Sequence, residues 1–200
     1  MRARFLTDME VRALRRVMRP QDWLPFAVAI ETGLRVGDVC KVRCDDLTPE
    51  GLVYVAEKTG KAGEARLTRR TRQALMLQAA RAAHGGSEWL FPSPNDPREH
   101  ISRQALWKRL KRASARAGVT AQGVSPHSMR KVYGVREYHE HGLDAAREGL
   151  QHRDIRTTEI YALADWCSGE NAREPLRRED LTRIIGYIAD WLGIPLENRQ

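Results

Sequence analysis

A chain of 200 residues with 42% hydrophobic side chains can bury a core of its own, which excludes a disordered tail. Its formal net charge of +8 indicates a polyanionic partner. Three cysteines without paired spacing argue against a disulfide framework. No signal-peptide pattern and no apolar run of about 18 residues is present, which argues against secretion and membrane insertion. We therefore expect a cytoplasmic, reduced setting.

The positive charge is concentrated in two segments that contain no acidic residue. Residues 65–87 carry five arginines, and residues 100–136 carry nine lysines and arginines. From residue 165 onward, by contrast, there are seven acidic and five basic side chains. An ordinary solvated surface mixes the two signs, so the acid-free segments favour a surface that follows a nucleic acid backbone.

The first 42 residues predict three helices. A capping box, Thr7–Glu10, begins a helix that Pro20 ends. A largely apolar helix follows over residues 22–33, and apolar side chains in residues 36–42 predict a short third helix. Arg35 then lies at the turn between a buried helix and an apolar one, although an arginine is usually found on the surface.

A β-hairpin is predicted next. Residues 52–56 form a β-branched, partly alternating strand, and residues 64–68 return as a second strand after a glycine-flanked turn. Lys58 lies at or near the tip of this hairpin. Lys61 competes for the same role, and a lysine in a loop is usually only solvated.

Two basic helices follow, separated by a proline-rich loop. The first begins at residue 68 and ends near residue 85. The second runs from residue 102 to about 117, with Leu106, Trp107 and Leu110 on one side and a basic cluster on the other. This second helix is the best candidate for lying against DNA, although basic amphipathic helices also bind membranes and calmodulin-like partners.

A histidine and an arginine open the next helix. Ser125 is a good N-cap, and Pro126 suits the first helical position, where an N–H is not needed. His127 and Arg130 then lie on one face of the first turns. A helix N-terminus favours anions, and the five donors of a guanidinium make this end a phosphate clamp.

We expect no metal and no cofactor. Cys40 and Cys44 are one helical turn apart, which is usual for side chains packed in a core. The histidines at 127, 139, 141 and 152 have no cysteine or carboxylate at a recognised zinc-ligand spacing.

Five short boxes resemble, in order and in separation, those of tyrosine recombinases, the phage integrase family. They are TGLRVGD at 32–38, EKTGK at 57–61, His127-x-x-Arg130, Leu150-Gln151-His152 and Tyr161. One departure is Gln151, where the family usually has glycine.

The resemblance implies a fold and a reaction. The fold is α+β and mainly α-helical, the tyrosine-recombinase catalytic fold with a small β-sheet or hairpin on one side. The reaction is site-specific recombination or integration of DNA, by a phage or mobile element, through a 3′-phosphotyrosine intermediate. In it Tyr161 is the nucleophile, Arg35 and Arg130 hold the non-bridging phosphate oxygens, Lys58 protonates the leaving 5′ oxygen, His127 shuttles the tyrosine proton, and His152 donates a hydrogen bond to the phosphate.

The basic segments supply the DNA-binding side chains that we expect. They are Arg66, Arg69, Arg103, Lys108, Arg109, Lys111, Arg112 and Lys131. The partner is double-stranded DNA, with four protomers assembling on two paired sites and a monomer in free solution. Two alternatives remain: a recombinase-like DNA-binding protein without cleavage activity, and a type IB topoisomerase-like enzyme.

The expected organisation is a catalytic domain over residues 1–165 and a tail over residues 166–200. The tail carries an amphipathic stripe that either folds back on its own domain or docks onto a neighbouring subunit. We expect the N-terminal DNA-clamping domain that is common in the family to be absent here, either because the chain is a single-domain member or because it is a fragment of a longer protein.

Overall fold

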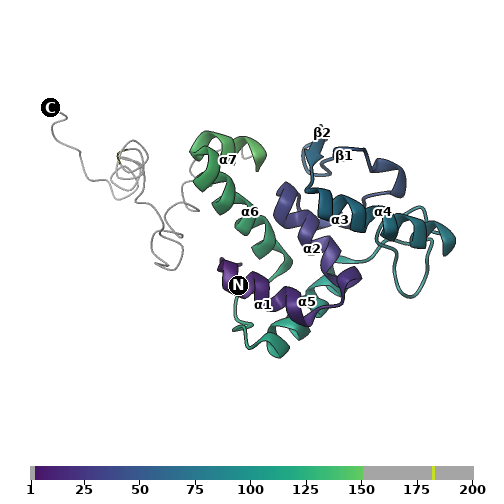
Figure 1. The fold of residues 1–200 in the computed structure, drawn as a ribbon, viewed down its shortest axis with the longest axis horizontal. Coiled ribbons are helices and arrows are strands. Elements are labelled where there is room, and N and C mark those ends of the chain that lie inside the picture. Colours follow the sequence, from purple (N-terminus) through teal and green to yellow (C-terminus); the bar gives the residue numbers. More distant parts are fainter. Residues whose placement is uncertain (1–2, 151–181, 183–200) are drawn as a thin grey trace. The chain divides into compact units, whose positions relative to one another are not determined.

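The computed structural model of the chain describes residues 3–150 and Thr182. The chain divides into two compact units, residues 1–133 and residues 134–200. The elements in chain order are α1 (Asp8–Val17), α2 (Pro20–Thr32), α3 (Val36–Cys40), the 3₁₀ turn η1 (Cys44–Asp46), β1 (Gly51–Val55), β2 (Ala62–Arg66), α4 (Arg69–His84), α5 (Arg103–Ala117), α6 (Pro126–His141) and α7 (Leu143–Gly149) (Figure 1). The described residues are mainly helical with one small antiparallel sheet, which confirms the predicted fold class.

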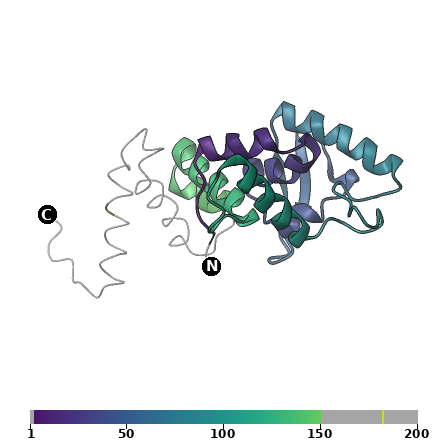
Figure 2. The same cartoon turned by 90° about the horizontal axis from the view of Figure 1, so that it is seen from below.

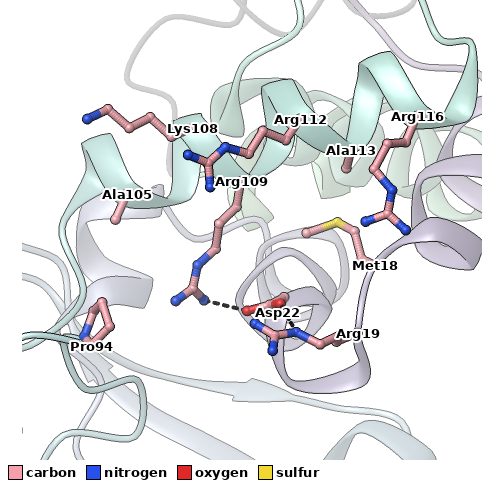
Figure 3. A pocket seen from close by; sticks show the side chains of 10 residues that line it. All are labelled: Met18, Arg19, Asp22, Pro94, Ala105, Lys108, Arg109, Arg112, Ala113 and Arg116. Carbon is pink, nitrogen blue, oxygen red and sulfur yellow. Dashed lines mark hydrogen bonds and ion pairs between the residues drawn. The ribbon is translucent and has the colours of Figure 1, made fainter.

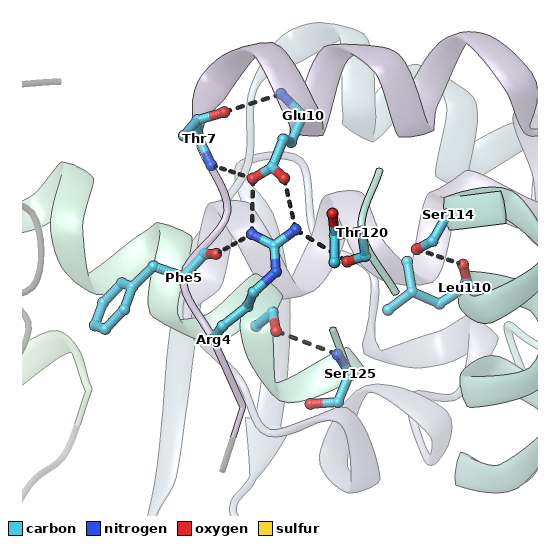
Figure 4. A network of polar contacts seen from close by, with 9 residues as sticks. Arg4, Phe5, Thr7, Glu10, Leu110, Ser114, Thr120 and Ser125 are labelled. Atoms are coloured by element: carbon cyan, nitrogen blue, oxygen red, sulfur yellow. Dashed lines mark hydrogen bonds and ion pairs between the residues drawn. The ribbon is translucent and has the colours of Figure 1, made fainter. Parts of the chain in front are cut away.

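Helix α1 begins at the predicted capping box. Thr7 Oγ1 accepts a hydrogen bond from the Glu10 N–H at 3.2 Å, and the Glu10 carboxylate accepts one from the Thr7 N–H at 3.0 Å. Arg4 forms a two-pronged ion pair with Glu10, at 2.9 and 2.5 Å, and donates to the carbonyl oxygens of Phe5 and Thr120 (Figure 4). Because Thr120 follows α5, the network fastens the N-terminal segment to the end of that helix.

Helix α2 forms the centre of the first unit. All of its residues from 23 to 30 are buried, and α3, α4 and β2 pack around it. The helix starts two residues earlier than predicted: α1 ends at Val17, and Pro20 is the first residue of α2 rather than the end of α1. The fixed backbone angle of proline suits a first helical position, which explains the difference.

Gly33 ends α2 in the left-handed conformation, with φ of 66°. A Cβ at this position would lie 2.4 Å from Tyr133 Cδ1, which is much closer than atoms can approach. Only glycine therefore satisfies both the backbone angle and the space.

The hairpin pairs Gly51 with Arg66 and Val55 with Ala62. Its second strand covers residues 62–66 rather than the predicted 64–68, because the turn is tighter than the glycine positions indicated. The Ala56 N–H donates to the Lys61 carbonyl at 2.8 Å, which closes the loop. Lys58 lies within the turn, as predicted.

Helix α5 packs against α1, and the two lie side by side in Figure 1 and Figure 2. Its buried stripe consists of Leu106, Leu110, Ala113 and Ser114. The expectation that Trp107 shares this stripe is wrong: its side chain is 43% exposed, and Lys111 Nζ lies 5.1 Å above the ring. The spacing i, i+4, i+7 defines the buried face, and Trp107 is rotated by about 100° from Leu106.

The described part of the second unit contains the end of α6 and all of α7. Gly142, with φ of 90°, makes the turn between them. Tyr138, Leu143, Ala146 and Leu150 are buried. Within residues 3–150, no helix is both long and apolar enough to cross a membrane. The predicted tail helix lies outside the described residues.

Candidate active site

Arg130 is held inside the protein by the start of α6. Pro126 is the first residue of this helix, as predicted, and the Ser128 N–H donates to the Ser125 carbonyl at 2.8 Å. The neighbouring Met129 is fully buried, and Arg130 itself is only 4% exposed. Its Nη1 donates to the Gly33 carbonyl oxygen. A buried guanidinium requires hydrogen-bond acceptors. The carboxyl end of α2 supplies one, a carbonyl oxygen that carries a partial negative charge.

Arg35 lies two residues after that carbonyl. It is the N-cap of α3 and is partly exposed, so the predicted helix-to-helix turn is confirmed. The bond from Arg130 to Gly33 therefore brings the start of α6 to the turn that carries Arg35. The two arginines are 95 residues apart in sequence, and this bond brings the segments that carry them together.

His127 provides an independent sign of this grouping. Loss of hydration lowers the pKa of its ring, and the positive charges of Arg130, Lys131 and Arg35 lower it further. The residue nevertheless retains an exposed surface. A ring open to solvent on one side and bordered by protein on the other satisfies both observations. A neutral imidazole at pH 7 can accept a proton.

The turn that carries Lys58 is fixed at two points, to α3 and to Lys41, the residue that follows it. Asp38 Oδ1 accepts a hydrogen bond from the Glu57 N–H at 3.0 Å, and the Glu57 carboxylate pairs with Lys41 Nζ at 2.7 Å. Asp38 is 7% exposed, and its Oδ2 has no hydrogen-bond partner within the part of the chain that the structure describes. Lys58 and Lys61 are both exposed, so the preference for Lys58 stays a prediction.

Arg103, the first residue of α5, joins the same neighbourhood. Its Cδ lies 3.6 Å from where a Cβ on Gly37 would be, and its charge acts on Glu57. Cys40, beneath it, is buried in the core, as expected. Burial raises the pKa of this thiol to about 12, despite the opposing charges of Arg103 and Lys41.

The sequence model of the phage integrase family matches residues 4–166. The chain belongs to the phage integrase family. It is 32% identical over 137 residues to tyrosine recombinase XerD of Rhizobium meliloti (strain 1021), an alignment that covers 65% of this chain and 43% of that protein. The chain thus spans less than half the length of this curated relative.

Solved structures of recombinases share the fold. A crystal structure of XerA recombinase matches with a TM-score of 0.69 and 17% identity, over 100% of this chain and 68% of that one. A crystal structure of a lambda integrase tetramer bound to a Holliday junction matches with a TM-score of 0.64 and 20% identity, over 88% of this chain and 50% of that one.

The DNA-binding side chains predicted for this integrase-family chain have different surroundings. Six of them are exposed: Arg66, Arg69, Arg103, Lys108, Lys111 and Arg112. Arg109 is half-buried and pairs with Asp22 at 2.9 Å (Figure 3). Lys131 donates to the Ala3 carbonyl at 2.6 Å and lies 4.4 Å above the Phe5 ring. Contact of these last two with DNA would require them to share or exchange their present partners.

Two members of the predicted site, His152 and Tyr161, lie outside the described residues. Among residues 3–150 and Thr182, no group of three or more histidine, cysteine, aspartate or glutamate side chains is placed to hold a metal ion. Sequence reasoning assigned no role to Asp38 or Lys41. The available signal for Asp38 was a carboxylate within an otherwise apolar short helix, because burial of a charged group is costly unless it is paired or hydrogen-bonded.

Proposed function

We propose that this integrase-family chain is the catalytic part of a site-specific recombinase, which cleaves and rejoins DNA through a 3′-phosphotyrosine intermediate. The observation that carries the proposal is the grouping of Arg35, Arg130 and His127 at the junction of α2, α3 and α6. Two guanidinium groups at one place suit the charge that develops on a phosphodiester under attack. Membership in the family and likeness to XerD support it.

In the proposed reaction, the Tyr161 oxygen attacks phosphorus and the bond to the 5′ oxygen breaks. His127, with its lowered pKa, takes the tyrosine proton. Lys58 gives a proton to the leaving 5′ oxygen, and His152 donates a hydrogen bond to the phosphate. Arg35 and Arg130 stabilise the two non-bridging oxygens throughout. Reversal of the same steps with another 5′ hydroxyl rejoins the strand.

We further propose that double-stranded DNA is the partner and that four copies act on two paired sites. Support comes from the matching fold of the lambda integrase tetramer bound to a Holliday junction. The catalytic domain would then cover residues 1–165, and the tail over residues 166–200 would dock onto a neighbouring subunit.

The decisive experiment traps the covalent intermediate. The protein is incubated with a pool of duplexes that carry a randomised segment and nicks, so that after cleavage the short fragment with the new 5′ hydroxyl diffuses away and cannot be rejoined. An adduct that survives SDS is expected for the wild type and for the control Tyr54→Phe, and none for Tyr161→Phe. Sequencing the attached DNA identifies the site.

The other results would contradict the proposal in different ways. An equal yield from Tyr161→Phe would exclude the assigned nucleophile. Salt-sensitive duplex binding without any adduct would favour a DNA-binding protein that does not cleave. Relaxation of supercoiled plasmids without any preferred sequence would favour a topoisomerase.

A further inference from the structure

Gly33, which accepts the hydrogen bond from Arg130, is also covered by an aromatic ring. Three atoms of the Tyr133 ring, Cδ1, Cε1 and Cγ, are the nearest to the position that a Cβ of Gly33 would take, all within 3.0 Å. The ring is therefore in van der Waals contact with the Gly33 α-carbon. This contact leaves room for a hydrogen atom and for nothing larger.

Arg130 and Tyr133 reach Gly33 from the same helix. They are three residues apart on α6, so their side chains lie next to each other on one face. Arg130 Nη1 donates to the Gly33 carbonyl oxygen, while the Tyr133 ring contacts the Gly33 α-carbon. The two side chains thus hold one residue at two different atoms, and a displacement of that residue would disturb both contacts.

Hydrogen bonds within the turn fix Gly33 relative to its own helix. The Gly33 N–H donates to the Ala29 carbonyl at 3.1 Å, and the Leu34 N–H donates to Thr32 Oγ1 at 3.2 Å. Because a peptide group is planar, the second bond also sets the plane of the Gly33 carbonyl. These bonds tie the turn to α2 only, and Tyr133 adds a contact between the turn and α6.

The ring also affects the strength of the bond that it adjoins. Tyr133 is partly exposed, whereas Arg130 is almost completely buried. An aromatic ring beside a charged hydrogen bond keeps water from competing for the donor, and the bond is stronger in less polar surroundings. A guanidinium is planar, so when one of its nitrogens is held, the directions of its other N–H groups are set as well. Stabilisation of a transition state depends on donors with such fixed directions.

We propose that Tyr133 is a positioning residue for DNA strand cleavage. Its ring holds Gly33 against α6 and thereby sets the direction in which the Arg130 guanidinium presents its other donors to the phosphate. The inference rests on the proposed function, in which Arg130 stabilises a non-bridging oxygen. The planar ring carries this role, and the phenol hydroxyl is not required for it.

The first test measures single-turnover adduct formation at saturating concentrations of the DNA sequence recovered from the adduct. Tyr133→Phe keeps the ring and should keep the wild-type rate. Tyr133→Leu removes the ring and should lower the rate about tenfold while DNA affinity is unchanged, because a misdirected donor costs rate rather than binding. Rates are compared below the melting temperature of each variant. Tyr133→Met, with an adaptable side chain, is used if the leucine variant does not fold.

A double-mutant cycle shows whether Tyr133 acts through Arg130. The Arg130→Lys variant has no planar fork to direct, so adding Tyr133→Leu to it should change the rate by less than about twofold. A tenfold loss in both backgrounds would overturn the proposal. So would a phenylalanine variant that is as slow as the leucine variant, because the hydroxyl would then carry the effect.

A measurement without DNA separates the contact from the reaction. In protein labelled with ¹⁵N-arginine, the side-chain N–H signal of Arg130 is identified by its absence from Arg130→Lys. Its exchange with water should be slow in the wild type and in Tyr133→Phe, and about tenfold faster in Tyr133→Leu. The control Tyr138→Leu makes the same change at a buried position further along α6 and should leave this exchange slow.

Equal exchange of the Arg130 signal in the wild type and in Tyr133→Leu would overturn the proposal. Failure of the proposed function would be seen differently. The wild type would then form no SDS-resistant adduct, while the exchange of the Arg130 signal would still respond to the leucine substitution.

Discussion

Arg130 shows how one side chain can contribute both to the fold and to the proposed reaction. It is almost completely buried, yet it carries a permanent charge that the core cannot hold without acceptors. The Gly33 carbonyl is one such acceptor, and it lies at the end of the central helix. The contact therefore stabilises the junction of α2 and α6 while it orients the guanidinium.

Replacement of Arg130 by lysine tests this double role. The charge remains, but the planar fork that can bond a carbonyl and a phosphate at once is lost. We expect the rate of adduct formation to fall by about 10²–10³-fold, the usual effect of removing one transition-state donor. Single-turnover adduct assays measure the rate, and thermal melting measures stability. A lysine variant with the wild-type rate would remove Arg130 from the proposed mechanism.

His127 makes a pH-dependent prediction. Its pKa is lowered by loss of hydration and by the cations around it, so the ring stays neutral below the ordinary pKa of histidine, about 6.5. The acid limb of the adduct rate should therefore lie below about pH 6.5. His127→Gln should abolish that limb and slow the reaction, whereas His84→Gln, an exposed control at the end of α4, should change neither.

The same pKa has a consequence for stability. The unfolded chain binds a proton at this histidine more readily than the folded chain does. Stability from the neutral ring is therefore present above the unfolded pKa, about 6.5, and is lost as the pH falls toward the lower folded pKa. Urea unfolding between pH 7.5 and 5 measures this effect. As the pH falls, the free energy of unfolding of the wild type should decrease more than that of His127→Gln.

At the scale of single elements, α3 acts as the support of the hairpin turn. We expect Asp38→Ala to reduce the rate of adduct formation about tenfold or more, because the Glu57 N–H loses its acceptor and the adjacent Lys58 loses its position. DNA affinity should change little. Asp38→Asn keeps an acceptor oxygen and should restore most of the rate.

Amide hydrogen exchange at Glu57 distinguishes this positioning role from general damage. Exchange there should accelerate in Asp38→Ala and remain slow in Asp38→Asn. Equal exchange in both variants, or a parallel loss of DNA affinity, would contradict the assignment.

The capping network of α1 makes a prediction for stability. Burial acts to raise the pKa of Glu10, but the bonds from Arg4 and Thr7 outweigh it, so the pKa lies below its ordinary value of 4.5. The ionised carboxylate therefore stabilises the fold above about pH 4.5, and this contribution is lost as the pH falls through the lower folded pKa. Glu10→Gln should cost about 1–2 kcal/mol at pH 7. Urea unfolding should show a smaller difference at pH 3, and an undiminished one would contradict the prediction.

At the scale of the whole molecule, the sequence predicted most of the first unit because its elements carry local signals. The capping box at Thr7 and the glycine at 33 mark helix ends by their own chemistry. The second strand begins two residues before its predicted start because Gly60 alone of the two glycines lies in the loop, whereas Gly63 lies within the strand. Trp107 was placed on the buried side because its large aromatic ring suggests burial. Its angular position on the helix, which is outside the buried stripe, is the better guide.

Contacts between distant segments had no such signal. The resemblance to recombinases placed Arg35 and Arg130 in one site, but nothing local predicted that Arg130 would bind the Gly33 carbonyl. The pair that Asp22 forms with Arg109 is likewise invisible in the sequence, because the two residues lie on helices about 90 residues apart. Such contacts depend on how helices pack rather than on the pattern within any one of them.

The bond from Arg130 to the end of α2 determines when the arginine side chain loses its conformational entropy. A flexible arginine that bound phosphate would lose its rotational freedom at the moment of DNA binding. Here that loss occurs during folding, because the side chain is already confined. In the proposed reaction the Arg130 guanidinium would thus be preorganised, and DNA binding would not carry the cost of arranging it.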